Sequence, residues 1–346
     1  MTGGPNKNEQ RICDNACWRY IKRNSGILVA FFLLLLIFAT NSPAFLTNAN
    51  IINVLRQVSI NTVISCGMTY VILLGGIDLS VGSMLGVSGC LCVWMAVNGI
   101  PIGLAMIGGI AASSIFGLAN GVIISKAKLP PFIVTLAMME IGRGTSYIFT
   151  GGKPTRYDMP FFDSIGNGYV QFIPIPVIIM IVIVVTTSII LSRTKFGRHI
   201  YGVGGSREAA RFSGIKIDSI EIRVYTICGL LAGIAGIIMA SRLVGAQPTA
   251  GNGYELDAIA AVVLGGTSMT GGVGTVGGTV IGALIIGILN NGLNLLQVPS
   301  YWQKVFKGLI IIVAVYIDSV KNNKSFLNTF KGIFNGKNSK CSDIKP

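Results

Sequence analysis

Ionisable side chains are rare within the apolar stretches of this sequence, and their positions indicate where chemistry can occur. Glu140 and Arg143 lie inside one such stretch, whereas Asp78, Glu255 and Asp257 lie near the ends of others. A charge in an apolar environment is costly, so each needs a partner or a function. The i, i+3 spacing of Glu140 and Arg143 places both on one helix face and predicts an internal ion pair. For the other three, capping and packing of helix ends is the alternative to contact with a solute.

The residues that enzymes use most often are absent or isolated. The only histidine is His199, and the sequence contains neither His-Glu-x-x-His nor Gly-x-Ser-x-Gly. Among seven cysteines, Cys13 and Cys17 are close together but lack the second pair of ligands that a zinc site needs. No Gly-Lys pair has the other residues of a phosphate-binding P-loop. We therefore expect no enzyme, no ATP hydrolysis by the chain itself, no metal site and no cofactor.

The composition is typical of a membrane protein. Of 346 residues, 51% are hydrophobic and 12% are charged, and the mean hydropathy is +0.69. Soluble domains carry roughly 25% charged residues. The stretches 79–125 and 258–303 contain no charge, and each is long enough for two crossings of about 20 residues. This pattern excludes a soluble enzyme and, despite a net charge of +14, a protein that binds nucleic acid.

The distribution of apolar segments predicts an all-α polytopic membrane protein with about ten transmembrane helices. The expected spans are 25–43, 58–76, 79–97, 101–125, 130–149, 170–192, 224–241, 256–270, 276–297 and 303–318. Small residues recur four positions apart within them, which favours close helix packing in lipid. The pairs are Gly82/Gly86, Ala105/Gly109, Gly117/Gly121, Gly229/Gly233 and Gly278/Gly282.

The basic residues predict an orientation. The N-terminal tail, the turn 126–128, the loop 193–223 and the residues after 318 contain 5, 2, 7 and 6 of the 27 Lys and Arg residues. Because basic segments resist translocation, we expect both chain ends in the cytoplasm. The expected organisation is a cytoplasmic N-tail (1–24), a single transmembrane domain (25–318) and a basic cytoplasmic C-tail (319–346).

The loop 193–223 contains the signals of a short helix. Ser206 is suited to the N-cap, Glu208 favours the helix start, Ala209 and Ala210 continue the turn, and Gly214 can end it. A helix of about two turns is not stable alone, because isolated helices need roughly 12–15 residues. It must therefore pack on the protein's own helix ends or dock into a partner.

Two segments resemble each other within the chain. Residues 71–76 (Val-Ile-Leu-Leu-Gly-Gly) are similar to residues 261–266 (Ala-Val-Val-Leu-Gly-Gly), and each precedes a stretch rich in Gly, Ser or Thr. The similarity predicts an internal repeat of the two halves, as in many transport folds. Chance similarity between apolar segments is the alternative.

Three sets of residues resemble those of a known family. Glu208-Ala209-Ala210-x3-Gly214 resembles the coupling loop of ATP-binding-cassette (ABC) importer permeases. Segments 75–83 and 254–274 resemble signatures of the monosaccharide branch of that family, and the resemblance extends over residues 24–322. The signature positions are Gly76, Asp78, Ser80, Gly82, Glu255, Asp257, Gly265 and Gly266.

The resemblance implies a permease subunit that forms the path for ribose or a similar monosaccharide in a bacterial inner (plasma) membrane. It also implies three protein partners: a second permease copy, a double-cassette ATP-binding subunit that engages Ser206, Glu208, Ala209, Ala210 and Gly214, and an extracytoplasmic sugar-binding protein. Membrane lipid surrounds the assembly. The alternative is a self-sufficient secondary carrier or facilitator, although no span contains the carboxylate relay common in ion-coupled carriers.

A neutral sugar is bound by hydroxyl and amide groups rather than by fixed charge. Several such groups lie in or beside the predicted spans, where bridging between helices is the competing role. The candidates for the substrate path are Asn61, Ser83, Thr267, Asn290, Asn291 and Asn294.

Overall fold

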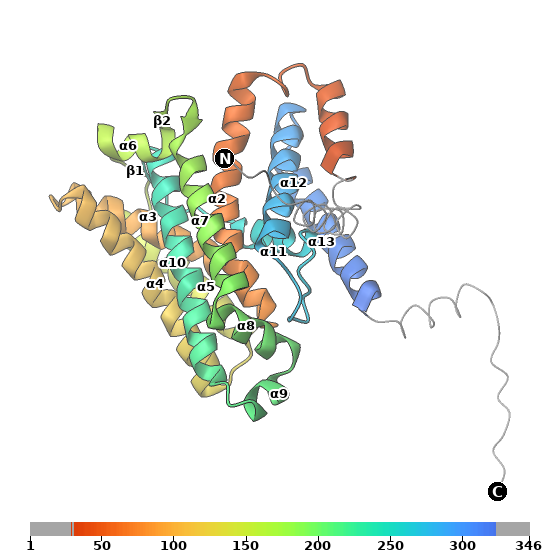
Figure 1. Cartoon of the computed structure of the whole chain (residues 1–346). Coiled ribbons are helices and arrows are strands. Elements are labelled where there is room, and N and C mark those ends of the chain that lie inside the picture. Colours follow the sequence, from red (N-terminus) through yellow and green to blue (C-terminus); the bar gives the residue numbers. More distant parts are fainter. Residues whose placement is uncertain (1–28, 30, 323–346) are drawn as a thin grey trace, which may run out of the picture.

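The computed structural model describes residue 29 and residues 31–322, and this part of the chain is almost entirely helical (Figure 1). The expected N-tail (1–24), with Cys13 and Cys17, lies outside the described residues. So does most of the expected C-tail (319–346). After a helix at Phe31–Asn41, the helices are α2 (Asn48–Leu73), α3 (Val81–Val97), α4 (Ile102–Ala127), α5 (Pro131–Thr150), α6 (Pro160–Asn167), α7 (Ile175–Arg193), α8 (Lys195–Gly205), α9 (Arg207–Phe212), α10 (Ile217–Arg242), α11 (Tyr254–Leu264), α12 (Val276–Leu295) and α13 (Ser300–Asn322).

The strands are short and form two antiparallel pairs. β1 (Thr155–Arg156) pairs with β4 (Gly245–Ala246), and β2 (Tyr169–Val170) pairs with β3 (Ile173–Pro174). Both pairs lie in the connections between helices, so they fix loops rather than form a sheet layer.

The described helices agree with a polytopic membrane protein. Each predicted span overlaps a helix, and α4, α7, α10 and α12 are long and apolar enough to cross a membrane. The structure corrects the expected span at 256–270. Helix α11 has 11 residues and therefore a length of about 16 Å, about half of the hydrocarbon thickness. It is too short to cross alone.

Small residues allow the central helices to approach closely. Helices α4 and α10 lie side by side (Figure 1), and a Cβ added at Gly117 would lie 3.0 Å from the Cα atom of Gly229. Gly278 and Gly282 of α12 similarly face the backbone of Gly265 and Ala261. These contacts confirm the packing role predicted from the four-residue spacing.

The two similar segments end their helices in the same way. After α2, Gly75 has φ +76° and the Gly76 amide donates to the Val71 carbonyl at 3.1 Å. After α11, Gly266 has φ +83° and the Thr267 amide donates to the Val262 carbonyl at 3.2 Å. The two helix ends share this capping geometry, but it falls one residue later in the second segment than the alignment of 71–76 with 261–266 requires. The internal repeat stays a prediction.

Candidate functional site

The short helix predicted in loop 193–223 is present as α9. The Ser206 hydroxyl accepts a hydrogen bond from the Ala209 amide at 3.2 Å, which makes Ser206 the N-cap. Glu208 lies in the first turn, and Gly214 follows the helix with φ +77°. Glu208 and Ala209 are exposed, so one face of α9 is accessible.

The other face of α9 packs on the protein itself. Ala210 is buried, and the Arg207 guanidinium lies 2.6 Å from the carboxylate of Glu221 on α10. Glu221 is buried and Arg207 is half-exposed, so the ion pair joins the start of α9 to α10 at the edge of the helix. The helix is therefore held by its own protein on one side and is free on the opposite side.

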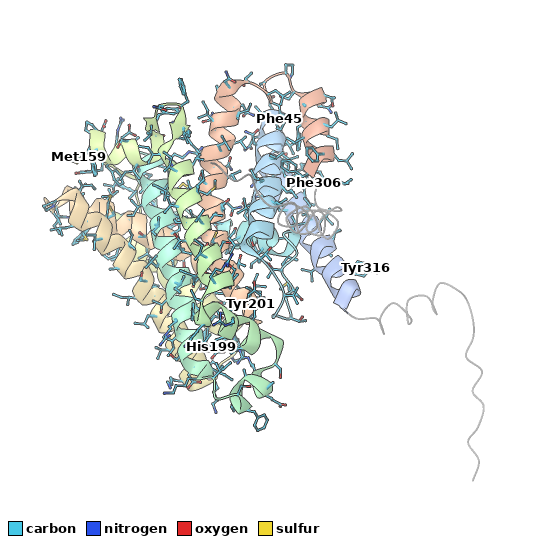
Figure 2. All side chains as sticks on the ribbon, in the orientation of Figure 1. Phe45, Met159, His199, Tyr201, Phe306 and Tyr316 are labelled. Atoms are coloured by element: carbon cyan, nitrogen blue, oxygen red, sulfur yellow. The ribbon has the colours of Figure 1, made fainter. Side chains whose placement is uncertain are left out.

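Helix α8 connects α9 to two loops that end apolar helices. The Tyr201 hydroxyl donates to the carbonyl of Gly274 at 2.7 Å, in the loop between α11 and α12. A Cβ at Gly204 would overlap the carbonyl oxygen of Leu73 and lie 2.6 Å from the amide nitrogen of Gly272. That amide donates to the Leu73 carbonyl at 2.9 Å. The labelled side chains of His199 and Tyr201 show that α8 lies at the same end of the bundle as α9 (Figure 2).

Asp78 stabilises the loop between α2 and α3. One carboxylate oxygen of this fully buried residue accepts from the amide of Ser80 at 2.9 Å and from its hydroxyl at 2.5 Å. Asn120 donates to the same hydroxyl at 2.8 Å. In this loop, outside the membrane-spanning helices, burial raises the pKa of Asp78 to about 6, opposed by the hydrogen bonds from Ser80. These contacts favour a packing role for Asp78.

The structure overturns the expected ion pair between Glu140 and Arg143. Arg143 instead donates to the Ala250 carbonyl at 2.8 Å, and its Nη2 lies 3.9 Å from Oε2 of Glu255 on α11. Among the described residues Glu140 has no ion pair, and it is exposed. The i, i+3 spacing permits a pair, but the long arginine side chain reaches the buried carboxylate of a neighbouring helix, where compensation of charge matters more.

Gly82 permits this neighbouring helix to approach. A Cβ at residue 82 would overlap Oε2 of Glu255 and the carbonyl oxygen of Gly251. Two predicted signature positions, Gly82 and Glu255, are therefore in direct contact.

Three of the predicted substrate-path residues line one polar pocket between α2, α11, α12 and α13. Asn61 comes from α2, and Asn290 and Asn294 come from α12. The pocket has a volume of about 140 Å³. Its full lining is Gln57, Asn61, Asn252, Tyr254, Asp257, Gly287, Asn290, Asn294, Gln303 and Lys307.

An ion pair forms one wall of this pocket. Nζ of Lys307 lies 2.9 Å from Oδ1 of Asp257, and Asn290 donates to Oδ2 of the same carboxylate at 3.1 Å. Sequence reasoning did not connect Lys307 with Asp257, because the two residues are 50 positions apart. It also missed the contributions of Gln57, Asn252, Tyr254 and Gln303.

The other predicted path residues lie elsewhere. Asn291 exchanges two hydrogen bonds with Asn50, at 2.8 and 3.0 Å. Ser83 donates to the Ser80 carbonyl at 2.8 Å, and Thr267 is buried in the loop after α11. None of these three lines the polar pocket.

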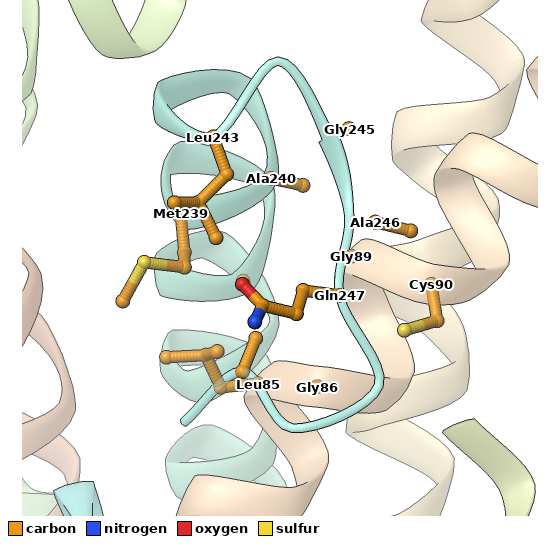
Figure 3. Close-up of a pocket in the computed structure, with 12 residues that line it drawn as sticks. Leu85, Gly86, Gly89, Cys90, Met239, Ala240, Leu243, Gly245, Ala246 and Gln247 are labelled. Atoms are coloured by element: carbon orange, nitrogen blue, oxygen red, sulfur yellow. The ribbon is translucent and has the colours of Figure 1, made fainter. Parts of the chain in front are cut away.

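A second pocket, between α3, α10 and the segment that follows α10, is unsuited to a solute (Figure 3). Gln247 extends between Met239 and Leu85, and the remaining volume is about 10 Å³. One water molecule requires roughly 10–15 Å³. The polar pocket beside Asp257 is therefore the better candidate for binding.

Comparison with known proteins identifies the family. Residues 50–315 match the model of the family described as branched-chain amino acid transport system / permease component. The chain belongs to this permease family. The ribose import permease protein of Bacillus subtilis (strain 168) is 48% identical over 307 residues, which cover 87% of this chain and 94% of that protein.

Further relatives include a second ribose permease and a permease named for L-arabinose. The ribose import permease protein of Escherichia coli (strain K12) is 46% identical, over 85% of this chain and 93% of its own. The L-arabinose ABC transporter permease protein of Azospirillum brasilense is 37% identical, over 89% and 90% of the two chains. No solved structure matches the chain. These relatives confirm the resemblance to monosaccharide permeases, and the protein is a multi-pass membrane permease.

Proposed function

We propose that this chain is the transmembrane subunit of an ATP-driven importer and forms the path for ribose or a similar monosaccharide. The observation that carries the proposal is the identity of 48% and 46% to two ribose import permeases over most of both chains. The geometry of α8 and α9 supports it, because an exposed capped helix is attached to loops that end apolar helices.

In this proposal a separate double-cassette ATPase binds the exposed face of α9 around Glu208. The chain has no P-loop of its own, so the free energy of ATP hydrolysis must reach it through such a contact. Movement of α9 passes to α8 through Ser206, which is both the C-cap of α8 and the N-cap of α9. From α8 it passes to the two loops through Tyr201 and Gly204. The permease then acts as a two-state element that its partners bias.

The basic residues and the family support the rest of the proposed assembly. The loop 193–223 contains 7 of the 27 Lys and Arg residues, which favours the cytoplasmic side for α9. A second permease copy completes the path, and an extracytoplasmic binding protein delivers the sugar on the opposite side of a bacterial inner membrane. Such a protein would meet the face that contains α6 and the strands, far from α9 (Figure 1).

Reconstitution in liposomes tests the proposal. The complex of permease, ATPase and binding protein should import labelled ribose only when ATP is present on the ATPase side. The permease alone should import none. Sugar flux through the permease alone, downhill or driven by an ion gradient, would establish the alternative of a secondary carrier or facilitator. Comparison of ribose with xylose, galactose and arabinose would define the substrate.

A further inference from the structure

Two buried amide oxygens point to a ligand in the polar pocket between α2, α11, α12 and α13. Asn61 and Asn290 are only 5% and 7% exposed, and both line this pocket. Within the described part of the chain, neither Oδ1 atom has a hydrogen-bond partner. Buried polar groups in folded proteins are normally paired, so two acceptors in one pocket call for a donor from outside the chain.

The orientation of Asn290 is fixed by its own hydrogen bond. Its Nδ2 donates to Oδ2 of Asp257 at 3.1 Å, which leaves its Oδ1 as the free end of the amide. Gln303 likewise donates to Oδ1 of Asn294 at 2.8 Å and to the Val298 carbonyl at 2.8 Å. The wall of the pocket is therefore held in place before any ligand enters, which lowers the entropic cost of binding.

The charge of the pocket selects a neutral ligand. Asp257 and Lys307 are its two charged side chains, and they neutralise each other at 2.9 Å. The other polar groups are five asparagines or glutamines of α2, α12 and α13, together with Asn252 and Tyr254. Amides and a phenol offer both donors and acceptors without net charge, and this is the chemistry that binds hydroxyl groups.

We propose that this pocket binds one polyhydroxylated neutral solute within a single copy of the chain. Two hydroxyls of the solute donate to Oδ1 of Asn61 and of Asn290. The volume of about 140 Å³ is many times the roughly 10–15 Å³ that one water needs, so the pocket accommodates a small polyol. The proposal rests on the function proposed above and adds a location for the sugar that does not require the second copy.

Uptake by the complete reconstituted complex provides the first test. In N61L, leucine retains the approximate size but removes the acceptor, and we expect the rate of ribose uptake to fall about fivefold or more. The matched control is N98L, the same substitution at an exposed asparagine that follows α3 and lies outside the pocket. It should transport at the wild-type rate. Binding of the ATPase should be unchanged in both.

Protection of an introduced cysteine provides the second test and needs no partner protein. The N294C variant of the purified permease should react with a small thiol reagent. Ribose at about 100 mM, a concentration suited to weak binding, should slow this reaction severalfold. Cys13, Cys17 and Cys341 are first replaced by Ser in this variant. The four remaining native cysteines are buried, so the background reaction is low. Glycine betaine at equal osmolarity should give no protection.

The results separate the two proposals. If the wild-type complex imports ribose while N61L imports it equally fast and ribose leaves N294C unprotected, the pocket proposal is wrong and the importer function stands. Protection by glycine betaine equal to that by ribose would likewise exclude a polyol site. If the wild-type complex imports no sugar, the function itself fails.

Discussion

The Arg143 guanidinium lies 3.9 Å from the Glu255 carboxylate and connects α5 to the start of α11. Both side chains are largely buried, and Arg143 also donates to the carbonyl of Ala250 in the preceding loop. The contact fixes the position of a helix that is too short to cross the membrane by itself. Charge compensation between distant segments is therefore part of what holds the second half of the chain.

Replacing Arg143 by Met should destabilise the protein by about 3 kcal/mol, because Glu255 would remain buried without its partner. Thermal unfolding of the purified permease in detergent measures the effect. The control is Arg156→Met, since Arg156 lies exposed in a loop and its 3.4 Å pair with Asp158 should contribute little stability. Equal stability of R143M and wild type would show that the ion pair is not needed.

The exposed face of α9 should determine binding of the ATPase. Glu208→Lys reverses a charge in the first helical turn, and Gly214→Ala places a side chain at φ +77°, which costs roughly 1–2 kcal/mol. Both should lower co-purification of the ATPase and ribose uptake at an unchanged amount of permease in the membrane. Lys216→Ala, at an exposed side chain of the same loop that makes no capping hydrogen bond, is the control. Normal uptake by both variants would refute the coupling role.

Removal of the Tyr201 hydroxyl should weaken the connection between α8 and the loop after α11. In Tyr201→Phe the hydrogen bond to Gly274 is lost, at a cost of about 1 kcal/mol. We expect the ATPase to bind normally but to hydrolyse more ATP for each sugar imported. Tyr157→Phe is the control, because it removes a tyrosine hydroxyl that contacts the Met159 sulfur at 3.4 Å in a loop far along the chain from α8. An unchanged ratio of ATP to sugar in Y201F would contradict this route.

Asp78 should act through hydrogen bonds to Ser80 rather than through its charge. Asp78→Asn retains an acceptor for the Ser80 amide and hydroxyl, so it should fold and transport nearly as wild type. Asp78→Leu leaves these two donors without their acceptor and should cost about 1–3 kcal/mol. Unfolding temperatures and uptake rates distinguish the two variants. Loss of transport in D78N with full stability would instead indicate a functional charge.

Local signals in the sequence predicted local structure well. Ser206 and Gly214 correctly delimit the short helix α9, because capping depends on residues a few positions apart. The small residues at 117 and 229 correctly indicate close packing. The break after Leu264 was missed, because hydropathy remains high through the glycine-rich residues that follow and carries no signal for backbone direction.

Contacts between distant segments could not be predicted in the same way. Asn61 and Asn290 belong to one pocket, whereas Asn291, next in the chain, points to Asn50 on another side of the helix. Which asparagine faces the pocket depends on the rotation of α12 against α2. Likewise, Arg143 has two carboxylates within the length of its side chain, and only the packing of α11 decides between them.

The hydrogen bond from the Gly272 amide to the Leu73 carbonyl has a consequence for synthesis of the protein. Leu73 is made early and Gly272 late, and a chain is synthesised and inserted from its N-terminus. Until the later segment is present, the Leu73 carbonyl lacks this partner. The end of α2 therefore gains its last backbone hydrogen bond only when translation has passed Gly272.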